Sequence, residues 1–203
     1  MRAPPWHRIA IATVITALPL VAAPQSIREI DFKNASYAWD DLDRGVPSNW
    51  HWLAQLPHGS VRLKNGQHRV SDGSESGNTF PDLSLVSVTY GDLFGDGREE
   101  AAVHLLYRTG GTANWSYLYV YTLDSQQPKL IAVLESGSRA DGGLLRVKIQ
   151  KHLLILDFLD SELRDGDCCS EGFVRVRYHW QRDKFIEPGV RQKGKLPLIV
   201  HRP

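Results

Sequence analysis

The residues best placed to do chemistry lie in one short acidic stretch, YGDLFGDGREEAAVHL. Asp92, Asp96 and Glu100 stand at positions 1, 5 and 9 of a turn in which Gly97 permits a sharp bend. Carboxylate oxygens at such spacing are ligands that Ca²⁺ prefers, and the backbone carbonyl of Arg98 can add another. The stretch therefore predicts a calcium site whose ligands are Asp92, Asp96, Arg98 and Glu100.

This stretch resembles the loop of VCBS and integrin-type FG-GAP repeats, in which acids at alternate positions bind calcium between two strands of a propeller blade. Phe94 departs from that pattern, because such loops place an oxygen ligand there. Water or another loop would have to complete the six to eight oxygens of a calcium ion. The alternative is an ion-free hairpin turn in which Asp92 and Asp96 hydrogen-bond to their own backbone.

A second candidate site is a row of aromatic side chains in NWSYLYVYT. Side chains alternate across a strand, so four rings share one face, those of Trp115, Tyr117, Tyr119 and Tyr121. If that face meets solvent, the rings can stack on sugars or on an apolar patch of a partner. The alternative is aromatic packing between the layers of a two-layer fold.

Two glycine loops, TGGTAN and SRADGG, follow predicted strands and offer a third candidate ligand site. Their polar side chains are those of Asn114, Arg139 and Asp141. Backbone amides of such turns can form an anion-binding nest, to which Arg139 would add charge. Ordinary hairpin and loop geometry is the alternative explanation of the glycines.

The only two cysteines of the chain are adjacent, Cys168 and Cys169. A disulfide between neighbours is strained, because consecutive α-carbons lie about 3.8 Å apart, below the usual disulfide range. The alternatives are two reduced thiols or an intermolecular bridge. The surrounding acidic segment, DFLDSELRDGDCCSE, fits no recognised metal loop and is also explained by solvated charges.

No catalytic signature is present: the chain contains no G-x-S-x-G elbow, H-E-x-x-H pair or phosphate loop, and its histidines are scattered. These observations favour a protein that is not an enzyme. The alternative is a secreted hydrolase acting on cell-wall or extracellular polysaccharide, because the carboxylate pair of a glycosidase is a property of the fold and leaves no local motif.

The N-terminus predicts export. Residues 1–23 combine Arg2 and Arg8 with the apolar run IAIATVITALPLVAA, which is typical of a signal peptide and too short for a permanent membrane span. No cysteine for lipid attachment follows it, so a periplasmic or secreted protein is expected. Residues 24–203 are predicted to form a single β-rich domain. A net charge of +1 and scattered basic residues argue against a nucleic-acid partner.

Period-two alternation predicts an all-β fold, either an antiparallel sandwich, an open barrel or a curved meander sheet. The predicted strands cover 27–32, 61–64, 67–70, 83–90, 99–107, 115–123, 129–134, 144–149, 153–159, 173–180 and 184–186. Asn65-Gly66 predicts a two-residue hairpin turn, and Ser48 begins the one short helix expected, which ends before Pro57.

Several segments together, GDLFGDGREEA, GGTANWSYLYVYTL, GSRADGGL and the paired cysteines, resemble a family of uncharacterised exported bacterial proteins. That resemblance implies export and a β-rich fold but no activity. The sequence thus predicts an exported, non-catalytic binding protein whose partner is an unknown protein or carbohydrate of the cell envelope, with calcium as a candidate stabilising ion.

Overall fold

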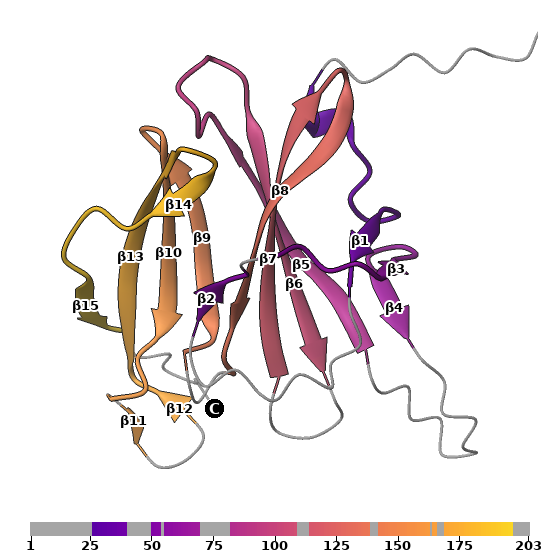
Figure 1. Cartoon of the computed structure of the whole chain (residues 1–203). Coiled ribbons are helices and arrows are strands. Elements are labelled where there is room, and N and C mark those ends of the chain that lie inside the picture. Colours follow the sequence, from indigo (N-terminus) through magenta and orange to yellow (C-terminus); the bar gives the residue numbers. More distant parts are fainter. Residues whose placement is uncertain are drawn as a thin grey trace, which may run out of the picture.

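The computed structural model describes residues 26–39, 50–53, 55–69, 82–108, 114–138, 142–162, 164–165 and 169–196. The all-β class predicted from the alternation is confirmed, with antiparallel sheets throughout (Figure 1). The predicted signal peptide, Arg139, Asp141 and Cys168 lie outside the described residues. Within the described part of the chain, no helix is long and apolar enough to cross a membrane.

The larger sheet has six strands in the order β2-β8-β7-β6-β5-β4. Its strands are β2 (His51–Trp52), β4 (Gln67–Arg69), β5 (Asp82–Gly91), β6 (Glu100–Arg108), β7 (Asn114–Asp124) and β8 (Gln127–Ser136). Strands β5 to β8 form a meander in which every strand pairs with the next along the chain. All four lie where the sequence predicts them, because each has strong alternation between clear turn signals.

The second sheet has five strands, four of them in the order β14-β13-β10-β9, while β15 pairs with another part of β13. Its strands are β9 (Leu144–Gln150), β10 (Leu153–Leu159), β13 (Gly172–Gln181), β14 (Lys184–Ile186) and β15 (Gln192–Lys195). Lys151 and His152 join β9 to β10 with φ of 51° and 59°, the left-handed pair that a tight hairpin requires. Two small sheets complete the fold, β1 (Ser36–Ala38) with β3 (Ser60–Arg62) and β11 (Arg164–Asp165) with β12 (Cys169–Ser170).

The two large sheets face each other across an apolar core (Figure 1). Leu118, Leu134 and Phe158 are fully buried there. Two tryptophan rings join this core: Trp50 stacks on Phe158 with 4.1 Å between ring centroids, and Trp52 stacks on Phe185 at 4.4 Å. The two sheets are therefore held together by apolar burial of the kind expected of a sandwich.

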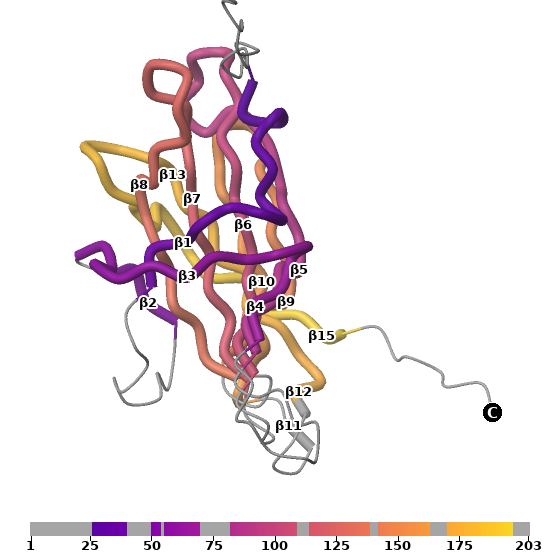
Figure 2. Tube along the Cα trace, turned by 90° about the vertical axis from the view of Figure 1, so that its right-hand side faces the viewer, coloured from indigo at the N-terminus to yellow at the C-terminus, as the bar shows by residue number. Residues whose placement is uncertain are grey.

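The other face of the six-stranded sheet carries a second core, covered by the N-terminal part of the chain. In Figure 2, β1 and β3 run across the strands β5 to β7. Ile27, Phe32, Tyr37 and Leu63 come from this covering segment and are buried against the sheet. Each face of the six-stranded sheet consequently carries an apolar core.

Two local predictions are wrong. The strand expected at 27–32 is instead a 3-10 helix, η1 (Ile27–Glu29). The Ser26 side chain caps its N-terminus by accepting a hydrogen bond from the Arg28 N–H. The helix expected to begin at Ser48 is replaced, in its described part, by the edge strand β2, where Trp52 pairs with Leu134. In both places tertiary packing of a few apolar side chains overrides a weak local pattern.

The turn at Asn65-Gly66 is confirmed, with φ of 54° and 81°, and Lys64 and Gln67 exchange both backbone hydrogen bonds across it. The strands on either side do not continue as a hairpin. β3 pairs with β1, whereas β4 pairs with β5, so this turn carries the chain from the N-terminal cover into the edge of the six-stranded sheet.

Candidate functional site

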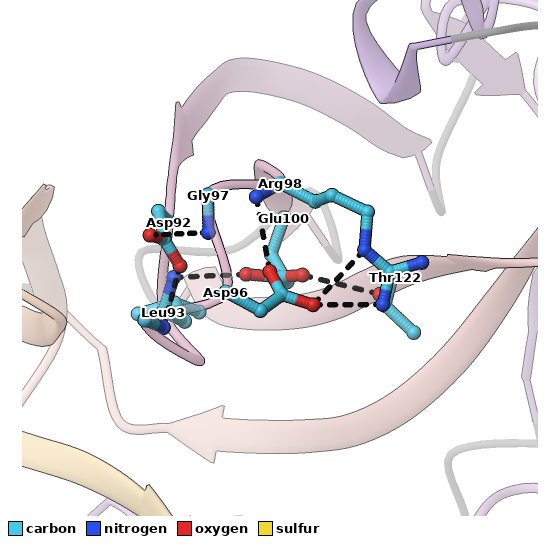
Figure 3. Close-up of polar contacts among 8 residues, drawn as sticks. Asp92, Leu93, Asp96, Gly97, Arg98, Glu100 and Thr122 are labelled. Atoms are coloured by element: carbon cyan, nitrogen blue, oxygen red, sulfur yellow. Dashed lines mark hydrogen bonds and ion pairs between the residues drawn. The ribbon is translucent and has the colours of Figure 1, made fainter.

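The predicted calcium loop is the turn between β5 and β6 (Figure 3). Its backbone bends at Gly95 and Gly97, with φ of 76° and 83°, a region in which only glycine is unstrained. The Asp92 carboxylate accepts hydrogen bonds from both glycines, at 2.6 Å from the Gly95 N–H and 3.0 Å from the Gly97 N–H. The Asp92 side chain therefore closes the turn by accepting hydrogen bonds from backbone N–H groups of the same turn.

Asp96 is bound within the same turn by Arg98. One carboxylate oxygen accepts the backbone N–H of Arg98 at 2.9 Å, and the other accepts Nε and Nη2 of its guanidinium at 2.9 and 2.7 Å. These hydrogen bonds, the backbone one first, lower the pKa of Asp96. Both groups are exposed, so the ion pair itself adds little to stability.

Glu100 is the buried member of the set, with 1% of its surface exposed. Its two carboxylate oxygens accept the Leu93 N–H at 2.8 Å and the Thr122 hydroxyl at 3.1 Å. Burial raises the pKa of Glu100, and the two hydrogen bonds act in the opposite direction. Glu100 thus joins the turn to the neighbouring strand β7.

His152 is a contact of this turn that sequence reasoning missed. Its Nδ1 lies 3.0 Å from the Asp92 carbonyl oxygen, so the tautomer protonated at Nδ1 donates to that oxygen. The ring also lies against Gly95. His152 belongs to the β9–β10 turn of the other sheet and is distant in sequence, so no local pattern could have indicated the contact.

All six carboxylate oxygens of Asp92, Asp96 and Glu100 accept hydrogen bonds from protein groups. This geometry matches the alternative to a calcium loop, namely an ion-free hairpin turn whose acidic side chains hydrogen-bond to protein groups. Within the described residues, no group of three or more His, Cys, Asp and Glu side chains is arranged to hold a metal. For Asp96 to coordinate calcium, its carboxylate would have to turn away from Arg98. Calcium binding therefore stays a prediction.

Glu100→Leu is expected to lower the free energy of unfolding by about 1–3 kcal/mol, because it leaves the buried Leu93 N–H without an acceptor. Glu100→Gln is the matched control, since its amide can accept from Leu93 and donate to the Thr122 hydroxyl. Because the folded-state pKa of Glu100 is raised, wild type gains stability relative to Glu100→Gln as the pH falls toward the unfolded value of 4.5. Chemical unfolding across this pH range measures both effects, and a flat difference between wild type and Glu100→Gln would contradict the second.

The aromatic row does not face solvent. Tyr117, Tyr119 and Tyr121 are all less than 10% exposed, and Trp115 is partly buried. Tyr119 donates a hydrogen bond to the Ala38 carbonyl at 2.7 Å. The interpretation of this row as a solvent-facing binding platform is therefore wrong, and the rings pack inside the fold. The N-terminal segment supplies the layer that covers them.

The strand ends that flank the two glycine loops lie at one end of the six-stranded sheet. Arg108 pairs with Asn114 across β6 and β7, and Ser116 pairs with Ser136 across β7 and β8. Residues 109–113 and 139–141 of these loops, which include Arg139 and Asp141, are outside the described residues, so the anion site stays a prediction. The same holds for the disulfide, since only the backbone of Cys169, in β12, is described.

A cavity of about 390 Å³ flanks the β5–β6 turn. It is lined by Ser26, Ile27, Gly97, Arg98, Glu99, Thr122 and Leu123. Its two charged side chains are already engaged, Arg98 with Asp96 and Glu99 with Arg28. The cavity therefore offers a ligand mixed polar and apolar walls but no uncommitted charge.

The fold assembles one surface that the sequence analysis did not anticipate. The outer face of the five-stranded sheet brings together four basic side chains, Arg146, Lys148, Arg175 and Arg177. Their signal is the alternation of basic and apolar residues in LLRVKIQ and GFVRVRYHWQ, which was used only to predict strands. Scattered along the sequence, these residues become neighbours through strand pairing.

Comparisons with models of known protein families, with curated proteins and with solved structures found no match for this chain.

Proposed function

We propose that the protein is an exported, non-catalytic binding protein that presents the outer face of its five-stranded sheet to a partner. The observation that carries this proposal is the group of four basic side chains that β9 and β13 place on that face, where Asp157 is the one acid among the described strands β9, β10 and β13. A surface with one predominant sign of charge attracts a partner of the opposite sign.

The arrangement of layers supports the same surface. Each face of the six-stranded sheet packs into an apolar core. The five-stranded sheet packs the face that carries Leu156 and Phe158 into the first core, and its opposite face carries Ile155 and the four basic side chains. This second face is the broad sheet surface that the described residues leave to a partner.

The rival function, hydrolysis of a polysaccharide, is less well supported. Tyr117, Tyr119 and Tyr121 are buried and form no exposed platform beside a cleft. The protein without residues 1–23 is expected to show no turnover on a broad panel of glycoside, ester and peptide substrates. Turnover that survives repurification and is lost on substitution of a carboxylate would overturn the non-catalytic proposal.

Calcium is proposed as a stabilising ion at the β5–β6 turn. A ligand that binds only the native state at a hundredfold excess over its dissociation constant raises stability by about 2.7 kcal/mol. The melting temperature is therefore expected to rise in excess calcium relative to excess EDTA, and Asp96→Ala is expected to abolish the rise. Differential scanning calorimetry of both proteins in both conditions measures it.

Asp124→Ala is the matched control for that experiment. Asp124 is also an exposed acid paired with a basic side chain, that of Lys129. It is the last residue of β7 and lies outside the β5–β6 turn. It should leave the calcium shift intact. An equal melting temperature in calcium and EDTA would make the turn an ordinary hairpin, closed by the hydrogen bonds of Asp92 and Asp96 alone.

A further inference from the structure

We infer that the outer face of the five-stranded sheet binds an acidic polysaccharide through its four basic side chains. This inference rests on the proposed binding function and names the partner class and the residues that recognise it. It depends on the register of β9, β10 and β13, on the charge balance of the face and on the side chains that stand beside the charges.

Strand register places the basic residues in two parallel rows across the sheet. One row is Arg146, Asp157 and Arg175, and the next is Lys148, Ile155 and Arg177. Side chains two residues apart on a strand are separated by about 6.7 Å, and β9 and β13 lie two strand spacings, about 10 Å, apart. The four cations therefore form a flat, roughly rectangular array.

The acid on this face compensates only part of the charge. Asp157 is buried and bidentate with Arg175, at 2.6 and 2.9 Å, and Arg146 lies 3.5 Å away. Lys148 and Arg177 have no carboxylate partner among the described residues, and Arg177 donates instead to the side-chain oxygen of Gln192 at 2.8 Å. A chain of net charge +1 thus concentrates an excess of positive charge on one face.

The simple structural explanation is that Asp157 pairs with the two arginines to stabilise the sheet and that the other cations keep its face soluble. That explanation accounts for the row of Arg146, Asp157 and Arg175. It does not account for a second row in which both cations flank the neutral Ile155 and lack an acid. Like charges placed together cost stability, and a polyanion would offset that cost.

The side chains around the array favour a polysaccharide over other polyanions. A protein interface would be depleted of charge and enriched in aromatic residues at its centre. Phe173, the aromatic on this face, lies under the Arg175 guanidinium, with 5.3 Å from Cζ to the ring centroid, so it provides no stacking platform for bases. Of the large exposed hydrophobic side chains of the described residues, only Leu145 lies in this sheet, too few to insert into a lipid surface.

An extended acidic sugar chain meets the requirements of this face. It carries anionic groups at repeated intervals, it lies on a flat surface without needing a pocket, and its hydroxyls can pair with neutral polar side chains. Gln150 on β9 and His179 on β13 stand beside the cations of those strands, and Gln192 on β15 pairs with Arg175 of β13. Charge would supply most of the affinity, which should fall steeply with salt concentration.

The test uses heparin as the acidic polysaccharide and dextran as the neutral one, with binding followed by isothermal titration calorimetry at low and moderate ionic strength. Heparin is expected to bind and dextran is not. Reversing two charges in Lys148→Glu/Arg177→Glu should weaken heparin binding at least about tenfold, equivalent to about 1.4 kcal/mol. The conservative pair Lys148→Arg/Arg177→Lys should keep binding within about twofold of wild type.

The matched control is Lys33→Glu/Lys64→Glu, which changes the net charge equally at two exposed lysines of the N-terminal segment, away from this sheet. It should retain heparin binding. Equal losses in the two reversed pairs, or no heparin binding at low ionic strength, would overturn the inference that this face binds an acidic polysaccharide. A circular dichroism melt of each variant separates lost binding from lost folding.

Three further arms test the class of partner: double-stranded DNA, polyglutamate and vesicles containing phosphatidylglycerol. Tighter binding of any of these than of heparin, or equal binding of all, would overturn the choice of a polysaccharide. The outcomes are separable from those of the proposed function. Hydrolysis of heparin would refute the non-catalytic proposal and leave the surface in place, whereas absence of binding without turnover would refute only this inference.

Discussion

Replacing Phe158 by alanine is expected to lower the free energy of unfolding by about 3–5 kcal/mol, the range typical of a buried aromatic ring. Phe158 is fully buried between the two sheets and stacks on Trp50, with an interplanar angle of 6°. The substitution removes the ring and leaves a cavity that β-strands pinned by their ladders cannot readily close. Urea unfolding monitored by tryptophan fluorescence measures the loss.

Phe158→Leu is the control, because it keeps an apolar side chain in the same place and should cost clearly less than alanine. The slope of free energy against urea should be unchanged in both variants if the native and unfolded states stay equally compact. A loss below about 1 kcal/mol for alanine would mean that the sheets are not packed on each other through this residue.

The second large effect is expected from Tyr37→Ala, at about 3–5 kcal/mol, because Tyr37 anchors the N-terminal cover. Tyr37 is fully buried, and its hydroxyl donates to the Phe32 carbonyl at 2.5 Å. Its ring lies edge-on to Tyr119 and Tyr121, with centroids 5.4 and 6.4 Å apart. Burial raises the pKa of the Tyr37 hydroxyl, in keeping with an interior position.

Tyr37→Phe separates the ring from the hydroxyl and should cost only about 1 kcal/mol, the usual contribution of one hydrogen bond. Hydrogen exchange supplies a second measurement. If the cover is integral to the fold, amides of β6 and β7 should exchange faster in Tyr37→Ala than in Tyr37→Phe. Equal exchange in the two variants would show that the six-stranded sheet does not depend on its N-terminal layer.

The turn between β5 and β6 was largely predictable from sequence. Gly97, with acids before and after it, indicates a bend that side chains close locally, and Asp92 and Asp96 do so. The partners of Glu100 and Asp92 outside the turn, Thr122 and His152, were not predictable. Thr122 comes from β7 and His152 from the β9–β10 turn, so both meet the β5–β6 turn only after the two sheets have formed.

The aromatic row and the basic face show the same limit. Alternation correctly places Tyr117 and Tyr119 on one side of a strand, and Arg175 and Arg177 on one side of another. It does not say which side becomes buried. For the tyrosines the N-terminal segment supplies a covering layer, whereas the described residues place no such layer over the basic face.

The sequence by itself determined the all-β class, most strands of both large sheets and the tight turns, because period-two alternation and left-handed turn residues act over a few neighbouring positions. The tertiary structure decided which strand faces are covered, that η1 and β2 replace the expected strand and helix, and that scattered basic residues form one array. These outcomes depend on contacts between residues tens of positions apart, such as Tyr119 with Ala38. Such contacts form only when burial of apolar surface offsets the entropy of closing long loops, and no local pattern records that balance.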